Sequence, residues 1–339
     1  MLSRSLCLPA IFISVVFVVI AAKPWAAHST SNTLNAPNRT SGTGRSLKAR
    51  NPVMKLAKLK KGERQKSGGR KKRRESSTSL NGSGSCSDCK SLEGYVPPGE
   101  IDETIRKMVG KYRGGGGSEN VAIQQARGVI ETGLYPEFSG GAECPEIDSE
   151  KWAIDYSYKR GKPALHKGID IPQPRGTPIR AIADGVVVGR FLNDGNKKGI
   201  EVMLRHTPAQ TGLKFWTYTQ YTHLQDMSPL PIGTAVKMGD EIGKTSNTGK
   251  MGKRVRRDAL HFAVFFSERP EWSNDGGVVT PKDGYFMDPN AFYRLQPPYD
   301  SQSILSLPAD KKTVQIPYMT SRGVVVPPDT KRIWPYLCR

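Results

Sequence analysis

The stretch Ala164-Leu-His-Lys-Gly-Ile-Asp-Ile171 constrains the fold more than any other part of the chain. It places His166 and Asp170 four residues apart around Gly168, and two prolines follow it closely. These neighbours disfavour a helix and favour an extended strand with a turn. Because side chains alternate along a strand, residues four apart face the same side. We therefore expect His166 and Asp170 to converge, as two side chains that can bind one metal ion.

Two later runs supply further histidines. The run Ala259–Phe266 is rich in aromatic and branched residues, which is typical of a strand. Its alternation places His261 on the same face as Ala259, opposite a face of apolar core residues. The run Thr217–Leu224 is also strand-like and carries His223 near its end. Two histidines and one aspartate would give zinc three protein ligands and leave a fourth position for water, as in catalytic sites.

The surrounding sequence predicts a mainly β fold. Short runs with strand character, such as Val186–Phe191 and Ile200–His206, are separated by turn signals such as Asn193-Asp-Gly195. This pattern favours an antiparallel sheet. His206, at the end of one of these runs, is a lesser candidate for the site. The sequence contains no Gly-x-Ser-x-Gly motif and no phosphate loop, so nothing supports a serine nucleophile.

In this region the chain resembles the LytM/lysostaphin-type zinc metalloendopeptidases of peptidase family M23. The resemblance covers about residues 150–293 and rests on several motifs that occur in the family's order. These motifs are His166-x-Gly168-x-Asp170, Gly176–Val188, Tyr221-Thr-His-Leu224, Val236–Lys244, Asn247-Thr-Gly249, Leu260-His-Phe262 and Met287-Asp-Pro289.

The resemblance implies an M23-type (LytM-like) domain in which His166, Asp170 and His261 bind Zn2+. It also implies that His223 is a catalytic residue beside the metal-bound water and that the substrate is a peptide bond of peptidoglycan. One position departs from the family, which shows His-x-His where this chain has Ala259. In the family, the imidazole at this position assists as acid/base or stabilises the charged intermediate. Two interpretations therefore stand: a cell-wall endopeptidase, or an impaired zinc-binding domain that binds the wall or regulates another wall hydrolase.

The N-terminal part of the chain predicts export. Residues 1–27 have the pattern of a signal peptide, with an uncleaved membrane anchor as the alternative. Residues 28–85 have the composition of a disordered basic linker. Between Arg45 and Arg74, 14 lysines or arginines face one acid, so 13 of the net charge of +20 lies there. This segment is either a solvated tether or binds an anionic wall or membrane surface. Nucleic acid is the least favoured partner, because aromatic residues are not interleaved.

Cysteine usage agrees with export. Once Cys7 leaves with the signal peptide, an even number of four cysteines remains. Two disulfides are expected, and the sequence leaves all three pairings open. The pair Cys86-Ser-Asp-Cys89 is a redox or metal motif in a second interpretation, although no thioredoxin-like βαβ pattern surrounds it.

We expect five segments along the chain. After the signal peptide and the linker, residues 86–149 form a small helical prelude with helices over Glu100–Val109 and Ser118–Glu131. The M23-like domain occupies residues 150–293, and a Pro-rich C-terminal tail occupies residues 294–339. The sequence carries no indication of an oligomeric state.

Overall fold

The computed structural model describes part of the chain, all of it within one compact unit, Ser76–Arg339. The described residues are 86–102, 104–105, 118–156, 158, 163–193, 198–250 and 257–339. The expected signal peptide or anchor and the basic linker lie outside these residues, and their boundaries stay predictions. None of the helices in the described ranges is long and apolar enough to cross a membrane.

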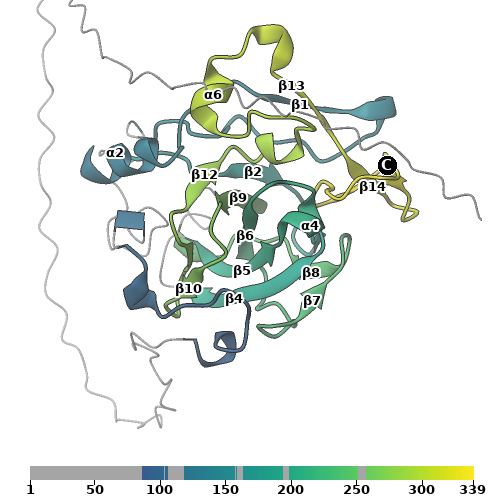
Figure 1. Cartoon of the computed structure of the whole chain (residues 1–339). Coiled ribbons are helices and arrows are strands. Elements are labelled where there is room, and N and C mark those ends of the chain that lie inside the picture. The colour runs from purple at the N-terminus through teal and green to yellow at the C-terminus, as the bar shows by residue number, and fades with distance from the viewer. Residues whose placement is uncertain are drawn as a thin grey trace, which may run out of the picture. The chain divides into compact units, whose positions relative to one another are not determined.

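A seven-stranded antiparallel sheet forms the centre of the described unit (Figure 1). Its strands are β2 (Ile169–Pro172), β4 (Gly185–Asn193), β5 (Gly199–His206), β6 (Trp216–Leu224), β7 (Ala235–Val236), β9 (Ala259–Ser267) and β12 (Tyr285–Met287). The order is β12-β9-β6-β5-β4-β7, and β2 pairs with the part of β9 that β12 leaves free. The prediction of a mainly β, antiparallel fold is confirmed.

The remaining strands form smaller sheets around this one. The pairs are β3 (Pro178–Arg180) with β8 (Glu241–Lys244), β10 (Trp272–Asn274) with β11 (Val279–Pro281), and β1 (Tyr135–Phe138) with β13 (Thr313–Ile316). A three-stranded sheet contains β14 (Tyr318–Thr320), β15 (Val325–Val326) and β16 (Leu337–Cys338). Among the described residues, α-helices with defined bounds are α2 (Ser118–Ala126), α4 (Pro208–Thr211) and α6 (Ser301–Leu305). Short 3-10 helices in the same part of the chain span Ser87–Cys89, Pro98–Glu100, Ser139–Gly141, Ala291–Tyr293 and Ala309–Lys311.

Both faces of β9 are covered, which the alternation of its sequence does not reveal. Leu260 and Phe262 are fully buried on the predicted core face. Phe265 is buried on the other face, because its ring packs against Phe286 at 4.6 Å between centroids. Trp152 extends this cover from the segment that precedes the sheet. The part of this face near the start of β9 carries the candidate site.

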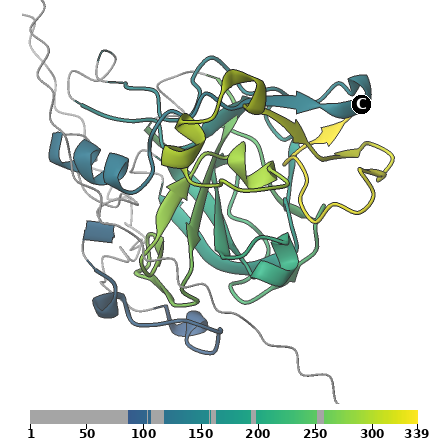
Figure 2. The same ribbon diagram turned by 45° about the horizontal axis from the view of Figure 1, so that its top comes forward.

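The segments before and after the sheet lie side by side. β1 and β13 pair in parallel across the top of the view in Figure 1, and Figure 2 shows the same neighbourhood tilted towards the viewer. The disulfide Cys144–Cys338 joins the same two segments, flanked by mutual backbone hydrogen bonds between Glu143 and Arg339. The tail is therefore part of the folded unit.

The predicted helix over Ser118–Glu131 is present but ends five residues early, at Ala126. Gly128 follows with a φ of 97°, and a Cβ there would lie 2.6 Å from the carbonyl oxygen of Phe286. The chain turns away at this close approach, which a helix could not make. Of the other predicted helix, Glu100–Val109, too few residues are described to give its extent.

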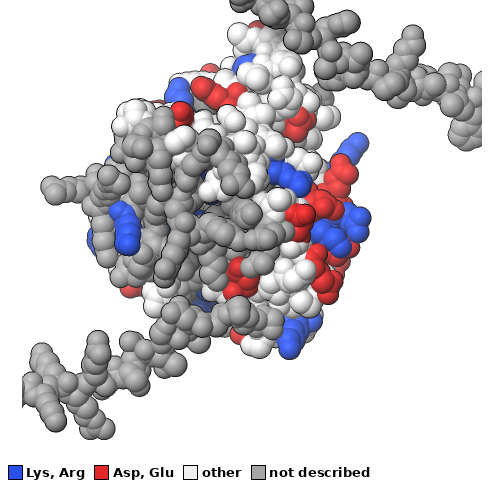
Figure 3. Space-filling view, turned by 90° about the vertical axis from the view of Figure 1, so that its left-hand side faces the viewer, with Lys and Arg blue, Asp and Glu red and all other residues white. Residues whose placement is uncertain are grey.

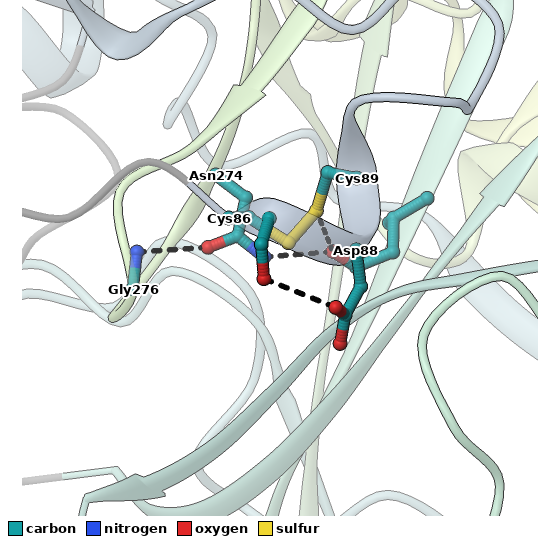
Figure 4. The surroundings of a disulfide bond; sticks show 7 residues. Cys86, Asp88, Cys89, Asn274 and Gly276 are labelled. Carbon is teal, nitrogen blue, oxygen red and sulfur yellow. Dashed lines mark hydrogen bonds between the residues drawn. A yellow bond between two sulfur atoms is a disulfide. The ribbon is translucent and has the colours of Figure 1, made fainter.

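The second disulfide joins Cys86 to Cys89 within the short Cys-x-x-Cys loop. Figure 4 shows that this loop lies beside Asn274 of β10. The Asn274 side chain donates to the carbonyl of Val188, whose oxygen is 3.9 Å from the sulfur of the buried Cys89. The expectation of two disulfides agrees with the structure, which pairs Cys86 with Cys89 and Cys144 with Cys338.

Charged side chains of both signs are interspersed on the face seen in Figure 3, where basic and acidic groups alternate along one side. This mixture contrasts with the segment from Arg45 to Arg74, which by sequence holds most of the excess positive charge. By its sequence, that segment is where we expect attraction to an anionic surface.

His206 belongs to the core rather than to the candidate site. Its ring is fully buried; Nδ1 donates to the carbonyl of Asp184 at 2.7 Å, and Nε2 accepts from Thr219 at 2.9 Å. Both ring nitrogens are thus satisfied in the neutral form. Burial lowers the pKa of His206 to about 4.

We predict that removing the Cys144–Cys338 disulfide destabilises the protein strongly, because this bond closes a loop of 194 residues. The Cys144→Ala/Cys338→Ala variant should lose about 2–5 kcal/mol of unfolding free energy, measured by urea denaturation. The Cys86→Ala/Cys89→Ala variant is the matched control, and its loss should be smaller because its loop spans only three residues. Equal losses in the two variants would contradict this assignment.

We also predict a pH dependence of stability from His206. In the unfolded chain His206 binds a proton as the pH falls below its ordinary pKa of 6.5, whereas in the folded chain it stays neutral until about pH 4. The free energy of unfolding should therefore fall by roughly 2 kcal/mol from about pH 7 to about pH 5 on account of this group. Denaturation of the metal-free protein at both pH values, compared with His206→Asn, isolates this contribution. A pH dependence as steep in the variant as in wild type would disprove it.

Candidate metal centre

Three side-chain atoms converge on one point between β2 and β9: Nε2 of His166, Oδ1 of Asp170 and Nδ1 of His261. The Asp170 oxygen is 2.8 Å from the His261 nitrogen and 3.3 Å from the His166 nitrogen, and the two nitrogens are 3.1 Å apart. A tetrahedral ion with bonds of about 2.0–2.1 Å needs ligand atoms about 3.3 Å apart. The triangle thus has the size and the donor chemistry of a zinc-like site.

The register of two strands places two of these groups. Asp170 of β2 lies directly opposite His261 of β9, so both side chains point to the same face. His166 does not lie on β2, which begins only at Ile169, so the predicted strand carrying both His166 and Asp170 is wrong for His166. Its backbone instead bonds with Ala153 and Ile154 in the preceding segment.

Gly168 is required by the close packing of these groups. A Cβ at this position would lie 2.4 Å from the carbonyl oxygen of Phe262 and 2.8 Å from Nε2 of His261. Any side chain would therefore displace the imidazole or push β2 away from β9. The residue between His166 and Asp170 is therefore a glycine because the ring of His261 occupies the space that a side chain would need.

Hydrogen bonds fix which nitrogen of His166 faces the centre. Its Nδ1 donates to the carbonyl of Lys151 at 2.9 Å, which leaves a lone pair on Nε2 directed at Asp170 and His261. The ring of Tyr156 packs edge-on against His166, with centroids 5.1 Å apart. The segment before the sheet thereby orients this side chain.

The electrostatics of the three groups favour a cation. Burial alone lowers the pKa of His166, but the carboxylate of Asp170 outweighs it and the net pKa is raised. Burial lowers the pKa of His261 to about 4. Burial would raise the pKa of Asp170, yet the two imidazoles hold it well below its usual range. An anion between two buried imidazoles therefore attracts either a proton or a metal ion.

A β-bulge brings His223 to the same place. Ile200 pairs with Leu224 and the next residue of β5 pairs with Thr222, so His223 is the extra residue on β6. Its φ of 66° lies in the left-handed region, where a non-glycine residue is uncommon. Bulges of this kind re-aim a side chain beside functional sites. The ring of His223 lies 6.1 Å from the ring of His261 between centroids.

The turn containing Thr248 holds His223 in position. Nδ1 of His223 donates to the carbonyl of Thr248 at 2.8 Å, which leaves the lone pair on Nε2. The hydroxyl of Thr248 donates to the carbonyl of Leu224 and accepts from the amide of Ile200. Burial lowers the pKa of His223, so the ring is kept ready to accept a proton.

Two glycines make this contact possible. A Cβ on Gly199 would lie 2.4 Å from the carbonyl carbon of Thr248, and one on Gly249 would lie 2.3 Å from the amide nitrogen of Gly199. Sequence reasoning did not assign a role to Thr248 or Gly199. The Asn247-Thr-Gly249 motif was the available signal for this turn.

Ala259 lies where the expected second imidazole would stand. It pairs with Pro172 at the start of β9, two residues before His261, and its side chain is nearly fully buried. Its methyl group offers neither a proton nor a hydrogen bond. Arg257, which the sequence reasoning also missed, brings a guanidinium to within 3.7 Å of Oδ2 of Asp170.

Known proteins match the part of the chain that carries this site. Residues 164–271 match the model of peptidase family M23. The DD-carboxypeptidase/endopeptidase Mpg of Neisseria meningitidis is 38% identical over 118 residues, which cover 35% of this chain and 24% of that protein. The peptidoglycan DD-endopeptidase ShyA of Vibrio cholerae is 33% identical over 132 residues, which cover 37% of this chain and 27% of that protein.

Among solved structures, LytU matches with 26% identity and a TM-score of 0.32, covering 50% of this chain and 96% of that one. The chain spans only about a quarter of the length of the two curated relatives. The match to the family model begins just before His166 and ends just after β9, so it contains the three converging side chains and His223. The candidate metal centre thus lies within the stretch of this chain that matches peptidase family M23.

Proposed function

We propose that this chain is an exported zinc metalloendopeptidase that hydrolyses peptide bonds in peptidoglycan. The observation that carries the proposal is the triangle of His166, Asp170 and His261, with the ring of His223 6.1 Å from that of His261. Three protein ligands leave a coordination position open, which a structural zinc site would fill with a fourth residue.

Each residue has a role in this proposal. His166, Asp170 and His261 would hold a zinc ion. Zinc bound there would polarise a peptide carbonyl and lower the pKa of a water molecule towards neutrality. His223, with its lone pair on Nε2, would accept a proton from the attacking water and pass it to the nitrogen of the departing amine. The carbonyl of Thr248, by accepting the hydrogen bond from Nδ1, keeps the imidazole ring of His223 in the required tautomer.

The substrate and the location rest on the relatives and on the cysteines. Relatives that match the same domain are named peptidoglycan endopeptidases. Two disulfides are compatible with an oxidising compartment outside the cytoplasm. In this proposal the basic segment from Arg45 to Arg74 binds an anionic wall or membrane surface and takes no part in the chemistry.

Ala259 favours a second candidate function. Without a second acid/base group in the site, the domain is instead a zinc-binding module that binds the wall or regulates another wall hydrolase. Removing one such group typically lowers the rate about 10²–10⁴-fold, so a slow enzyme and an inactive one are both compatible with Ala259. The two candidates differ in whether the protein cleaves peptidoglycan at all.

We predict one zinc ion per chain, removable by a chelator. His166→Ala/His261→Ala should lose it, as measured by elemental analysis, whereas the exposed Asp310→Ala should retain it. Because the pKa of His166 is raised above its ordinary value of 6.5, protons should compete with the metal already above that pH and weaken binding further as the pH falls. Stoichiometric zinc in the double variant would remove this site from consideration.

For the reaction, we predict that purified protein releases muropeptides with newly exposed amino groups from peptidoglycan, and that a chelator stops the release. His223→Ala should abolish cleavage while zinc is retained. Ala259→His should raise the rate by up to about 10²–10⁴-fold, because it restores a positioned imidazole. Chromatography of the released fragments measures all three. If zinc-loaded wild type and Ala259→His are both inert on several peptidoglycan types, the second candidate function replaces the first.

A further inference from the structure

Arg257 lies beside the metal centre, in the bend just before β9. It stands two residues before Ala259, outside the strand, and its ion pairs place its guanidinium beside Asp170. Its Nη2 atom is 3.7 Å from Oδ2 of Asp170 and 4.0 Å from Oε2 of Glu150, and it also pairs with Oδ2 of Asp148. One guanidinium thus lies among three carboxylates.

The two oxygens of Asp170 serve different partners. Oδ1 faces the imidazoles of His261 and His166, while Oδ2 faces Arg257. A carboxylate shared in this way offers a metal ion one oxygen and not two. Groups that hold the outer atom of a ligand in such a manner orient it and tune the metal.

The other two acids belong to the segment that packs against the site. The amide of Asp148 donates to the carbonyl of Asp170 at 3.0 Å, which fixes the backbone of Asp148 beside that ligand. Glu150 accepts a hydrogen bond from Tyr156, whose ring lies against His166. Both carboxylates therefore stand next to the ligands, although neither belongs to the converging triangle.

Charge makes this arrangement dependent on Arg257. The three carboxylates and the guanidinium carry a net charge of about −2, which a divalent ion would balance. Without the guanidinium, the carboxylates of Asp148 and Glu150 would lose this positive group beside them, and hard oxygen anions are attracted to an open coordination position. Arg257 is only one-third exposed, so solvent screens this attraction weakly.

We propose that Arg257 is a positioning residue: it keeps Asp170 a one-oxygen ligand and keeps Asp148 and Glu150 away from the metal's open position. The inference rests on the proposed function only in that it requires a metal at this site. Arg257 cannot exchange a proton at neutral pH, so it does not replace the imidazole absent at position 259.

Cobalt(II) tests this, because its visible absorption is strong in tetrahedral sites and weak at higher coordination numbers. Wild-type protein loaded with cobalt should show the strong spectrum. Arg257→Gln should lose intensity as further carboxylate oxygens bind, and with zinc its kcat should fall about 10–100-fold with KM nearly unchanged. Arg257→Lys keeps the charge without the planar fork and should lie between the two.

Two further variants make the test specific. Arg269→Gln is the matched control, because Arg269 forms an ion pair of the same kind with Glu271 on the surface, and it should leave spectrum and kcat unchanged. Adding Asp148→Asn and Glu150→Gln to Arg257→Gln should restore the strong spectrum. Thermal melting of each variant shows that it is folded.

The outcomes separate this inference from the proposed function. An unchanged cobalt spectrum in folded Arg257→Gln would overturn the inference, and so would failure of the acid replacements to restore it. Strong cobalt spectra with no cleavage of peptidoglycan by wild type would overturn the proposed activity alone. If wild type binds neither cobalt nor zinc, both are overturned.

Discussion

The antiparallel pairing of β2 with β9 is the constraint on which the site depends. It sets Asp170 directly opposite His261, and the two side chains meet at 2.8 Å. A slip of one residue would turn His261 towards the core and remove one of the three converging groups. Gly168 protects this register, because the ring of His261 occupies the space that any side chain there would need.

A second constraint is the bulge that contains His223. A left-handed backbone costs a non-glycine residue about 1–3 kcal/mol, so it persists only where the surroundings enforce it. Here the amide of His223 donates to the carbonyl of Lys198 and its ring to the carbonyl of Thr248. Close contact between Gly199 and Gly249 keeps that turn in place. The bulge and the turn together thus hold the imidazole of His223 beside the metal centre.

The site also depends on residues outside the segment that matches the family. The carbonyl of Lys151 selects the tautomer of His166, and Asp148 and Glu150 hold Arg257. Asp148, Glu150 and Lys151 all precede residue 164, where the match to the family model begins. The segment just before these three residues is tied to the C-terminal part of the chain by the Cys144–Cys338 disulfide and by the pairing of β1 with β13. The flanking segments therefore complete the site rather than merely extend the domain.

The sequence by itself predicted the longer strands of the sheet and the side chains that the structure brings together. Aromatic and branched runs predicted β5, β6 and β9 to within one residue at each end, because each run buries at least one face, and motif order singled out His166, Asp170, His223 and His261. It could not show that His166 precedes β2, since that position depends on bonds to residues 153 and 154. Only the tertiary structure revealed the bulge at His223, the choice among three disulfide pairings, and Arg257 beside Asp170. Each of these depends on contacts between residues far apart in the chain, and local alternation carries no information about them.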